Sequence, residues 1–354
     1  MATLKELSDR TGYSPATISR ILTADPSLAV TPEARQRVLE EAGKLNYAAT
    51  KSRRGRAPKR LLRVGVAEML NPAQRLEDPY YLYLRGGVER ACADSRFAFL
   101  PMERQGEKFS LPEGEEVDGI VAIGIFTPEE IEGLYALCPV LVFLDSSPDE
   151  ARSDSVVLNY RLGITQALDY LEELGHSEIA FVGPSWKLDD WKRPAPEERR
   201  RLFLELMARR GRKDPILIEA PMDARKSARA VAEFFCYCAL RPTALICANE
   251  ENAIGAFRAL REGGLRVPED ISLISFNDTP LSQLIEPPLT SVSTHLEEMA
   301  RTAVRLLAQR VGVEGKRAER ALPQKTIVPT TLVPRASAAP PHGAEERKES
   351  NDHL

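Results

Sequence analysis

The fold is decided by the opening stretch MATLKELSDRTGYSPATISRIL, residues 1–22. Thr3 has the spacing to a following glutamate that typifies a capping box, and glycine suits the end of the helix that it opens. Ser14 precedes a proline at the start of a second apolar-periodic segment, and Thr31 precedes one at the start of a third. Two helices joined by a short glycine-containing turn, followed by a third, predict a helix-turn-helix. A three-helix cap that never meets nucleic acid is the alternative.

Charge and composition narrow the class of protein. Residues 1–60 hold 12 Lys or Arg and 6 Asp or Glu, a net charge of +6; the whole chain has −4, so the remainder carries −10. A basic head on an acidic body favours contact between that head and a polyanion. No apolar run is long enough to cross a membrane, and the first residues lack the apolar core of a signal peptide. We therefore expect a cytoplasmic protein without membrane contact.

The residues of the head resemble one family in particular. MATLKE at 1–6, SPATISRIL at 14–22 and the segment from Arg35 to LNY at 45–47 are closely similar to the head of the lactose-repressor (LacI/GalR) family. The resemblance implies a sequence-specific transcription regulator, a repressor, with its helix-turn-helix in residues 1–47. It also implies a homodimer on double-stranded operator DNA, because a two-fold protein fits a pseudo-palindrome.

The same resemblance implies which side chains meet DNA. In the family the second helix enters the major groove, and its first residues read base edges. Here these residues are Pro15, Ala16 and Arg20. The first two have no side-chain donor, so Arg20 is expected to carry most of the direct readout. Phosphate contacts are expected from four hydroxyl side chains: Thr3, Ser14, Thr17 and Ser19.

A basic linker follows at residues 48–60. It contains KSRRGRAPKR, which is too polar to pack as a core element. Family members usually have a hinge helix here whose leucine wedges into the minor groove, but that leucine aligns with Arg56. We expect a basic arm instead, in which Arg53, Arg54 and Arg56 contact phosphates or the minor groove. A solvated, disordered tether is the alternative.

Residues 61–335 alternate between strand-like and helix-like segments, which predicts parallel sheets flanked by helices. The length favours two lobes. We place lobe 1 at about 61–158 and 293–324, and lobe 2 at about 159–292 and 325–335. Six buried strands are predicted: Leu62–Val66, Gly119–Ile123, Val140–Leu144, Glu178–Val182, Thr243–Cys247 and Ile271–Ser275. Three amphipathic helices are predicted between them: Tyr160–Leu174, Glu197–Arg210 and Asn249–Arg261.

The family resemblance continues through this second part. DPYY at 78–81, ANEENAIG at 248–255 and VPEDISLISFNDT at 267–279 are most similar to the branch of galactose-operon and evolved-β-galactosidase repressors. The resemblance implies an α/β effector and dimerisation domain like the periplasmic sugar-binding proteins, with two Rossmann-like lobes joined by three crossovers. It also implies a small sugar effector, galactose-like or galactoside-like, bound between the lobes.

Ligand residues carry over from the family one at a time. Asp145 ends a buried strand, and Arg199 lies where the family has its effector-binding arginine. Asn249 and Asn277 lie at the carboxyl ends of two strands, where open α/β sheets bind ligands. The full expected effector set is Tyr80, Tyr81, Asp145, Arg199, Asn249, Asn277 and Thr294. Tyr80 or Tyr81 can stack on a sugar face.

Several of these positions have a plainer interpretation. Asn249 can serve only as a helix cap, Arg199 as a solvated helix charge and Tyr81 as ordinary core. Thr294 stands where the family has a glutamine, and a usual aromatic residue falls near Asp223. These two departures from the family pattern concern the sugar that is recognised.

The remaining features exclude other classes. No phosphate loop, metal motif or nucleophile–base pair is present, so we expect neither an enzyme nor a bound cofactor or metal. A sugar carrier without DNA regulation and a sugar-metabolising enzyme are the rival functions, and the basic head argues against the carrier. Residues 336–354 are polar and poor in large apolar side chains, which predicts a disordered tail.

Overall fold

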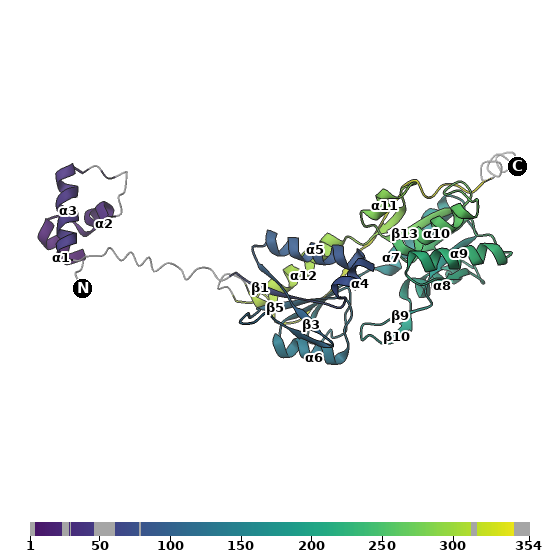
Figure 1. Ribbon diagram of the computed structural model, residues 1–354, viewed down its shortest axis with the longest axis horizontal. Helices are drawn as coiled ribbons and strands as arrows, with labels where there is room; N and C mark the ends of the chain where they lie inside the picture. The colour runs from purple at the N-terminus through teal and green to yellow at the C-terminus, as the bar shows by residue number, and fades with distance from the viewer. Residues whose placement is uncertain are drawn as a thin grey trace. The chain divides into compact units, whose positions relative to one another are not determined.

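The computed structural model describes residues 4–22, 28, 30–45, 61–77, 79–312 and 317–342. The chain divides into two compact units, Met1–Arg60 and Leu61–Leu354 (Figure 1). Each unit is described by itself. Four residues with predicted DNA contacts lie outside the described residues: Thr3, Arg53, Arg54 and Arg56.

The first unit has three helices: α1 (Leu4–Thr11), α2 (Pro15–Leu22) and α3 (Pro32–Lys44). Two of the three predicted caps are present, because Ser14 Oγ accepts from the Thr17 N–H at 3.1 Å and Thr31 Oγ1 accepts from the Ala34 N–H at 3.3 Å. The third, Thr3, lies outside the described residues. The helices enclose a small apolar core of Leu7, Ile18, Ile21, Val38 and Ala42. Leu39, which the apolar pattern of α3 also includes, is 50% exposed and lies outside this core.

Lobe 1 of the second unit is built on a parallel six-stranded sheet in the order β15-β7-β6-β5-β1-β2. Its strands are β1 (Arg63–Glu68), β2 (Ala98–Pro101), β5 (Gly119–Ile123), β6 (Leu141–Leu144), β7 (Asp154–Leu158) and β15 (Lys325–Val328). Helices α5 (Pro79–Asp94) and α12 (Leu296–Val311) pack on one face, and α6 (Pro128–Leu137) packs on the other. A sheet covered on both faces needs strands that are apolar throughout, as β6 is. A short helix, α4 (Pro72–Glu77), and a hairpin of β3 (Glu103–Gln105) and β4 (Lys108–Ser110) complete the lobe.

One close helix contact in lobe 1 explains a glycine. Helix α5 crosses α12 at Gly87, where an added Cβ would lie 2.9 Å from the Cβ of Ala300. Because real Cβ atoms do not approach so closely, glycine and alanine at these positions allow the two helices to pack. This contact holds the start of α5, and with it Tyr80 and Tyr81, against the sheet.

Lobe 2 repeats the architecture. Its six-stranded sheet has the order β11-β8-β12-β13-β14-β16, and all neighbours are parallel except β14 and β16. The strands are β8 (Ile179–Gly183), β11 (Ile216–Glu219), β12 (Ala244–Cys247), β13 (Ser272–Asn277), β14 (Thr290–Ser293) and β16 (Thr331–Val333). Helices α7 (Tyr160–Glu173) and α8 (Glu198–Arg209) cover one face, and α9 (Ala224–Tyr237) and α10 (Glu250–Glu262) cover the other. Helix α11 (Leu281–Leu284) follows β13, and a hairpin of β9 (Trp186–Leu188) and β10 (Pro194–Pro196) follows β8.

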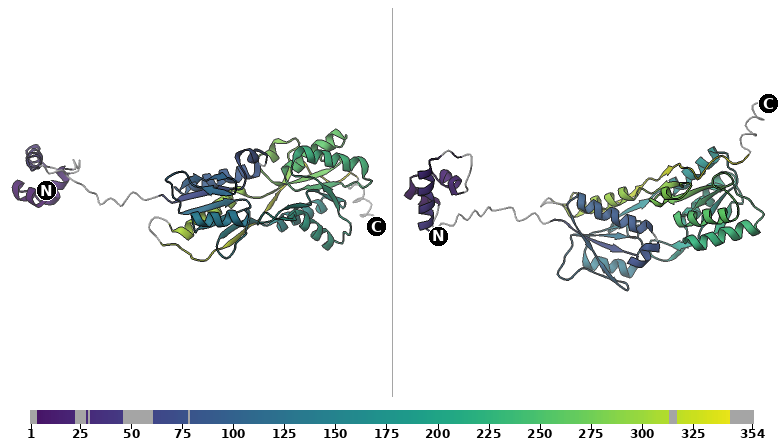
Figure 2. Two further views of the ribbon diagram at one scale, coloured as in Figure 1. Left: turned by 60° about the horizontal axis from the view of Figure 1, so that its bottom comes forward. Right: turned by 45° about the horizontal axis from the view of Figure 1, so that its top comes forward.

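The chain passes between the lobes three times: after β7, between β14 and α12, and between β15 and β16 (Figure 2). The predicted fold class is therefore confirmed, and the six predicted strands are present with ends displaced by at most two residues. One lobe boundary is wrong. Residues 325–328 form β15, which pairs in parallel with β7 and belongs to lobe 1, because the last crossover comes after this strand rather than before it.

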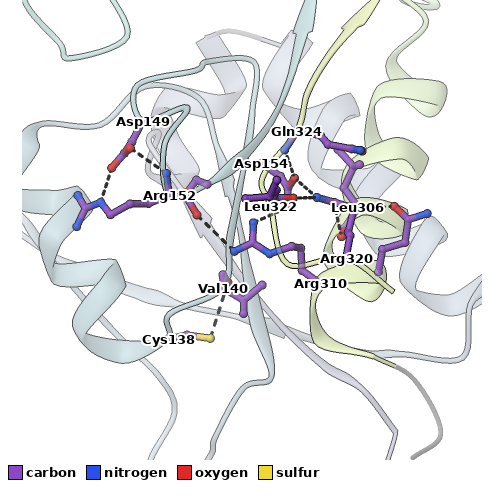
Figure 3. A network of polar contacts seen from close by, with 12 residues as sticks. Cys138, Val140, Asp149, Arg152, Asp154, Leu306, Arg310, Arg320, Leu322 and Gln324 are labelled. Carbon is purple, nitrogen blue, oxygen red and sulfur yellow. Dashed lines mark hydrogen bonds and ion pairs between the residues drawn. The ribbon is translucent and has the colours of Figure 1, made fainter. Parts of the chain in front are cut away.

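A polar cluster fixes the return of the chain from α12 to β15 (Figure 3). Asp154, at the start of β7, is fully buried and accepts hydrogen bonds from Arg320 Nη1 at 2.6 Å and the Gln324 N–H at 2.6 Å. Arg310 of α12 lies 3.4 Å from the same carboxylate. The two arginines compensate the negative charge of the buried carboxylate. Because the Gln324 N–H bonds the same carboxylate, these contacts hold β15 at the edge of the sheet.

The predicted disorder of residues 336–354 is wrong for residues 336–342, which pack on lobe 2. Ser337 is fully buried; its hydroxyl donates to the Leu273 carbonyl at 2.6 Å and accepts from the Thr290 N–H at 2.8 Å. The Ala339 carbonyl lies 2.9 Å from Nε2 of His176, which is also buried. A polar segment low in large side chains is ordered here because its hydrogen bonds complete the sheet. Residues 343–354 lie outside the described residues.

The described residues contain neither a membrane-spanning helix nor a metal-binding cluster. None of their helices is long and apolar enough to cross a membrane. The same part of the chain contains no cluster of His, Cys, Asp and Glu side chains suited to a metal ion.

Candidate functional site

The exposed start of α2 is the part of the first unit that corresponds to the predicted DNA-reading helix. Pro15, Ala16 and Arg20 are exposed, whereas Ile18 and Ile21 face the core. Ser14 and Thr17 hydroxyls lie 2.8 Å apart, and Ser14 caps the helix. The helix is therefore held by its apolar face, with the predicted base-reading side chains on the outside.

In the second unit, a small pocket lies where the two lobes meet. Its walls include Tyr80, Tyr81 and Asp145 of lobe 1, and Arg199, Asn249 and Asn277 of lobe 2. These are six of the seven predicted effector residues. Three further wall residues were not predicted: Tyr160, Lys187 and Met222. We call this cavity the inner pocket; its volume of about 20 Å³ is enough for one water molecule.

Asp145 is the central acceptor of the inner pocket. It follows β6 with φ +76°, a left-handed conformation that non-glycine residues rarely adopt. The Tyr81 hydroxyl donates to Oδ2 at 2.9 Å and the Tyr80 hydroxyl donates to Oδ1 at 3.1 Å. Burial raises the pKa of Asp145, although Lys187 and the two tyrosine hydroxyls act in the opposite direction. The carboxylate is thus oriented by two donors and keeps lone pairs for a ligand hydroxyl.

The tyrosines are at once core residues and pocket residues. Tyr80 and Tyr81 are 7% and 6% exposed, and their rings meet edge to face with centroids 5.1 Å apart. Burial raises the pKa of Tyr80 well above its usual value, so its hydroxyl remains a donor. Stacking of either ring on a sugar face stays a prediction.

Arg199 is buried at the start of α8, which rules out the interpretation as a solvated helix charge. It is 4% exposed, and its Nε donates to Glu197 Oε1 at 2.7 Å. Its Nη1 donates to the Ala248 carbonyl, and its guanidinium carbon lies 5.3 Å from the centre of the Tyr160 ring. Burial alone would lower the pKa of Arg199, but the charge of Glu197 raises it instead. A permanently charged donor therefore faces the pocket.

Asn249 and Asn277 end two neighbouring strands of lobe 2. Asn249 does cap α10, because its Oδ1 accepts from the Asn252 N–H at 2.9 Å, yet it also lines the pocket. Asn277 has φ +97° and is 8% exposed. Within the described ranges, no residue is hydrogen-bonded to the Asn277 side-chain amide or to Asn249 Nδ2. Both amides can therefore bond a ligand.

Thr294 does not line the inner pocket. It is fully buried, and its hydroxyl donates to the Asn277 carbonyl at 3.0 Å. The short side chain cannot reach past the Asn277 backbone, so Thr294 supports the loop that presents Asn277. The side chain of Asp223, near which an aromatic residue of the family was expected, caps α9, and the neighbouring Met222 lines the inner pocket.

A second, larger cavity lies beside the inner pocket and shares part of its lining. We call it the outer cavity; it has a volume of about 360 Å³ and shares Tyr81, Asp145, Tyr160 and Lys187 with the inner pocket. Its outer wall is the β9–β10 hairpin. The hairpin was not predicted, because its strands are short and largely exposed. The only signal is the long connection between β8 and α8, since such connections usually have about 2–6 residues.

Comparison with known proteins agrees with this architecture. Residues 168–338 match a family described as periplasmic binding protein-like domain. The chain is 33% identical over 346 residues to the HTH-type transcriptional repressor MelR of Bacillus subtilis (strain 168), covering 95% of this chain and 97% of the relative. It is 32% identical over 340 residues to the HTH-type transcriptional regulator GalR of Streptococcus thermophilus, covering 95% and 99%.

Among solved structures, the complex of the transcriptional regulator CelR with cellobiose has a similar fold. The TM-score is 0.64 at 22% identity, and the match covers 96% of this chain and 100% of that chain. Together with the two relatives, which align over nearly their whole length, this likeness extends from the head through both lobes. The chain belongs to the lactose-repressor (LacI/GalR) family of helix-turn-helix transcription regulators.

Proposed function

We propose that this regulator represses a carbohydrate-utilisation operon and that a small sugar bound between its lobes changes its affinity for operator DNA. The observation that carries the proposal is the convergence of Asp145, Arg199, Asn249 and Asn277, from four separate parts of the sequence, on one pocket between the lobes. Carboxylate, guanidinium and amide groups together bond the donors and acceptors of a ring of hydroxyls. The preference for galactose or a galactoside rests on the similarity to the galactose-operon branch.

The proposal also assigns the DNA contacts. A homodimer binds a pseudo-palindromic operator, with α2 of each copy in the major groove. Arg20 reads a base edge, Pro15 and Ala16 contact thymine methyl groups, and the hydroxyls of Ser14, Thr17 and Ser19 meet phosphates. Thr3 and the linker arginines Arg53, Arg54 and Arg56 would add phosphate or minor-groove contacts. The regulator would work in the cytoplasm, where its operator lies, and would catalyse no reaction.

Fluorescence anisotropy with DNA from upstream of the gene tests the proposed DNA contacts. We expect Arg20→Ala to cost about 1–3 kcal/mol of operator binding and to relax the preference at one base of each half-site. Arg10→Ala is the control, because Arg10 lies on α1 and is paired with Glu41. If the Arg20 variant kept the wild-type sequence preference, Arg20 would not be a base reader.

Titration of the protein–DNA complex with sugars tests the proposed effect of a sugar on operator affinity. The proposal expects a sugar in the inner pocket to alter operator affinity, which requires that it bind the DNA-bound and the free state with different affinities. Asn249→Asp is the sharpest variant. A carboxylate keeps the cap on α10 but replaces the Nδ2 donor, so sugar response should fall while folding is retained. An unaltered sugar response would remove Asn249 from the site.

A further inference from the structure

The sizes of the two cavities differ in a way that bears on the ligand. The inner pocket holds about one water, whereas the outer cavity, with about 360 Å³, falls within the ~300–1,000 Å³ typical of pockets for drug-sized ligands. A single hexose, with about twelve non-hydrogen atoms, is smaller than such ligands. The combined volume of the inner pocket and the outer cavity therefore exceeds the volume that one sugar ring would fill.

The β9–β10 hairpin, which forms the outer wall of this space, contacts lobe 1. Lys192, in the turn of the β9–β10 hairpin, donates to Glu130 Oε2 at 2.7 Å across the lobe junction. Glu130 is fully buried in α6 of lobe 1 and also accepts from the Thr127 N–H at 2.8 Å. Trp191 of the hairpin packs against the apolar core of lobe 1. Figure 1 shows β9 and β10 extending from lobe 2 toward α6.

The chemistry inside the outer cavity suits an uncharged polyol. Lys187 points a cation at its inner end and, among the residues that the structure describes, forms no ion pair. Asp190 is partly buried beside the Ser147 backbone N–H, which donates to its carboxylate. Leu188 and Ile125 add apolar surface. The lining has more carboxylates than lysines, which disfavours an anion. The carboxylates can accept hydrogen bonds from ligand hydroxyl groups, and the lysines can donate to them.

We propose that the effector has at least two sugar rings: one at the junction of the two cavities, bonded by Asp145 and the inner pocket, and the next in the outer cavity beside Asp190. This inference rests on the proposed function as a sugar-controlled regulator. The hairpin is then the element that selects the second ring. The site takes an oligosaccharide or a glycoside with a sugar-sized second group, in preference to a free monosaccharide.

Calorimetry on the full chain tests this with galactose and with lactose, melibiose and cellobiose. We expect at least one disaccharide to bind about tenfold or more tightly than galactose, because the second ring adds contacts that galactose lacks. Asp190→Asn keeps an amide oxygen that can accept from the Ser147 N–H, but it removes the charged acceptor that the ligand would bond. Ala195→Leu narrows the outer cavity from β10. Both should weaken the disaccharide about tenfold and leave galactose within about twofold.

Glu262→Gln is the matched control, since that carboxylate is exposed on α10 and lines neither cavity. Circular dichroism establishes that each variant is folded. If galactose bound as tightly as every disaccharide and neither cavity variant changed that, the two-ring inference would be overturned while the proposed function stood. If no sugar of either size bound, the proposed function would fail and the inference with it.

Discussion

The inner pocket and the β9–β10 hairpin face the same space but are built in different ways. Asp145, Asn249 and Asn277 lie at or just after the ends of buried strands, so the two sheets position them. The hairpin is short and largely exposed, and a few contacts attach it to the other lobe, among them the Lys192–Glu130 ion pair and the packing of Trp191. Groups at strand ends are fixed by the fold itself, whereas the position of the hairpin depends on a few contacts between residues distant in sequence.

This difference predicts different responses to mutation. Removal of one charge from the buried Arg199–Glu197 ion pair beside the inner pocket leaves the other charge uncompensated, so it should lower the stability of the whole second unit. A change in the hairpin should affect local opening, because few contacts hold it. The predictions below test that contrast in order of decreasing effect.

The largest effect is expected for Arg199→Ala. This change leaves Glu197, which is 2% exposed, without the partner that Arg199 Nε provides at 2.7 Å. Breaking a buried ion pair from one side costs about 3–5 kcal/mol of the free energy of unfolding. Urea denaturation measures this loss, and calorimetry should show that sugar binding falls as well.

A double variant separates the two roles of Arg199. Arg199→Met with Glu197→Gln removes both charges and should recover part of the stability, because no unpaired charge remains. Sugar binding should stay weak. If the double variant were no more stable than Arg199→Ala, loss of packing rather than an orphaned charge would explain the effect.

The same contrast explains what the sequence predicts well. Apolar runs such as LVFL at 141–144 mark strands buried on both faces, and the polar residue at the end of a run is a predicted ligand position. Six ligand residues were predicted in this way and through the family resemblance, and they line one pocket. Thr294 was predicted together with them, but its hydroxyl bonds the Asn277 backbone carbonyl and does not face the cavity. The sequence does not show which of these two directions the side chain takes.

The hairpin and the segment 336–342 could not be predicted for a common reason. Both are polar and short of apolar periodicity, and both are ordered by partners far away in sequence, as Lys192 is by Glu130 and Ser337 by Leu273. Such pairings leave no trace in local composition. Polar character alone therefore does not separate a disordered segment from one whose hydrogen bonds complete a sheet.

A moderate effect is expected for Ser337→Ala. The change removes the hydroxyl that satisfies the Leu273 carbonyl at 2.6 Å and the Thr290 N–H at 2.8 Å. Leaving buried backbone groups unpaired should lower the free energy of unfolding by about 1–3 kcal/mol. Ser110→Ala is the control: Ser110 is exposed in β4, so its loss should stay within about 0.5 kcal/mol. Equal effects for the two variants would mean that residues 336–342 do not stabilise lobe 2.

A smaller loss is expected for Lys192→Met, about 1 kcal/mol, because Arg104 and the Thr127 N–H still satisfy Glu130. The local consequence should be clearer. Amide hydrogen exchange in residues 186–196 should accelerate, while exchange in the strands of lobe 2 stays unchanged. Lys192→Arg keeps the charge and should exchange like the wild type. Uniformly faster exchange across lobe 2 would show that the hairpin is part of the global folding unit.

The smallest effect is expected for Asp145→Asn, which keeps the shape of the side chain and changes only its charge. Burial raises the pKa of Asp145 in the folded state, so the stability linked to its protonated form is present below the unfolded pKa and is lost as the pH rises through the folded one. The variant cannot titrate at this position. Its free energy of unfolding, relative to the wild type, should therefore increase as the pH rises from the ordinary pKa of an aspartate to above the raised pKa of the folded state. Sugar binding should fall over the same range, because the charged acceptor is gone. A difference in stability that did not depend on pH would contradict this prediction. It would mean that Tyr80, Tyr81 and Lys187 fully offset the free-energy cost of burying the carboxylate.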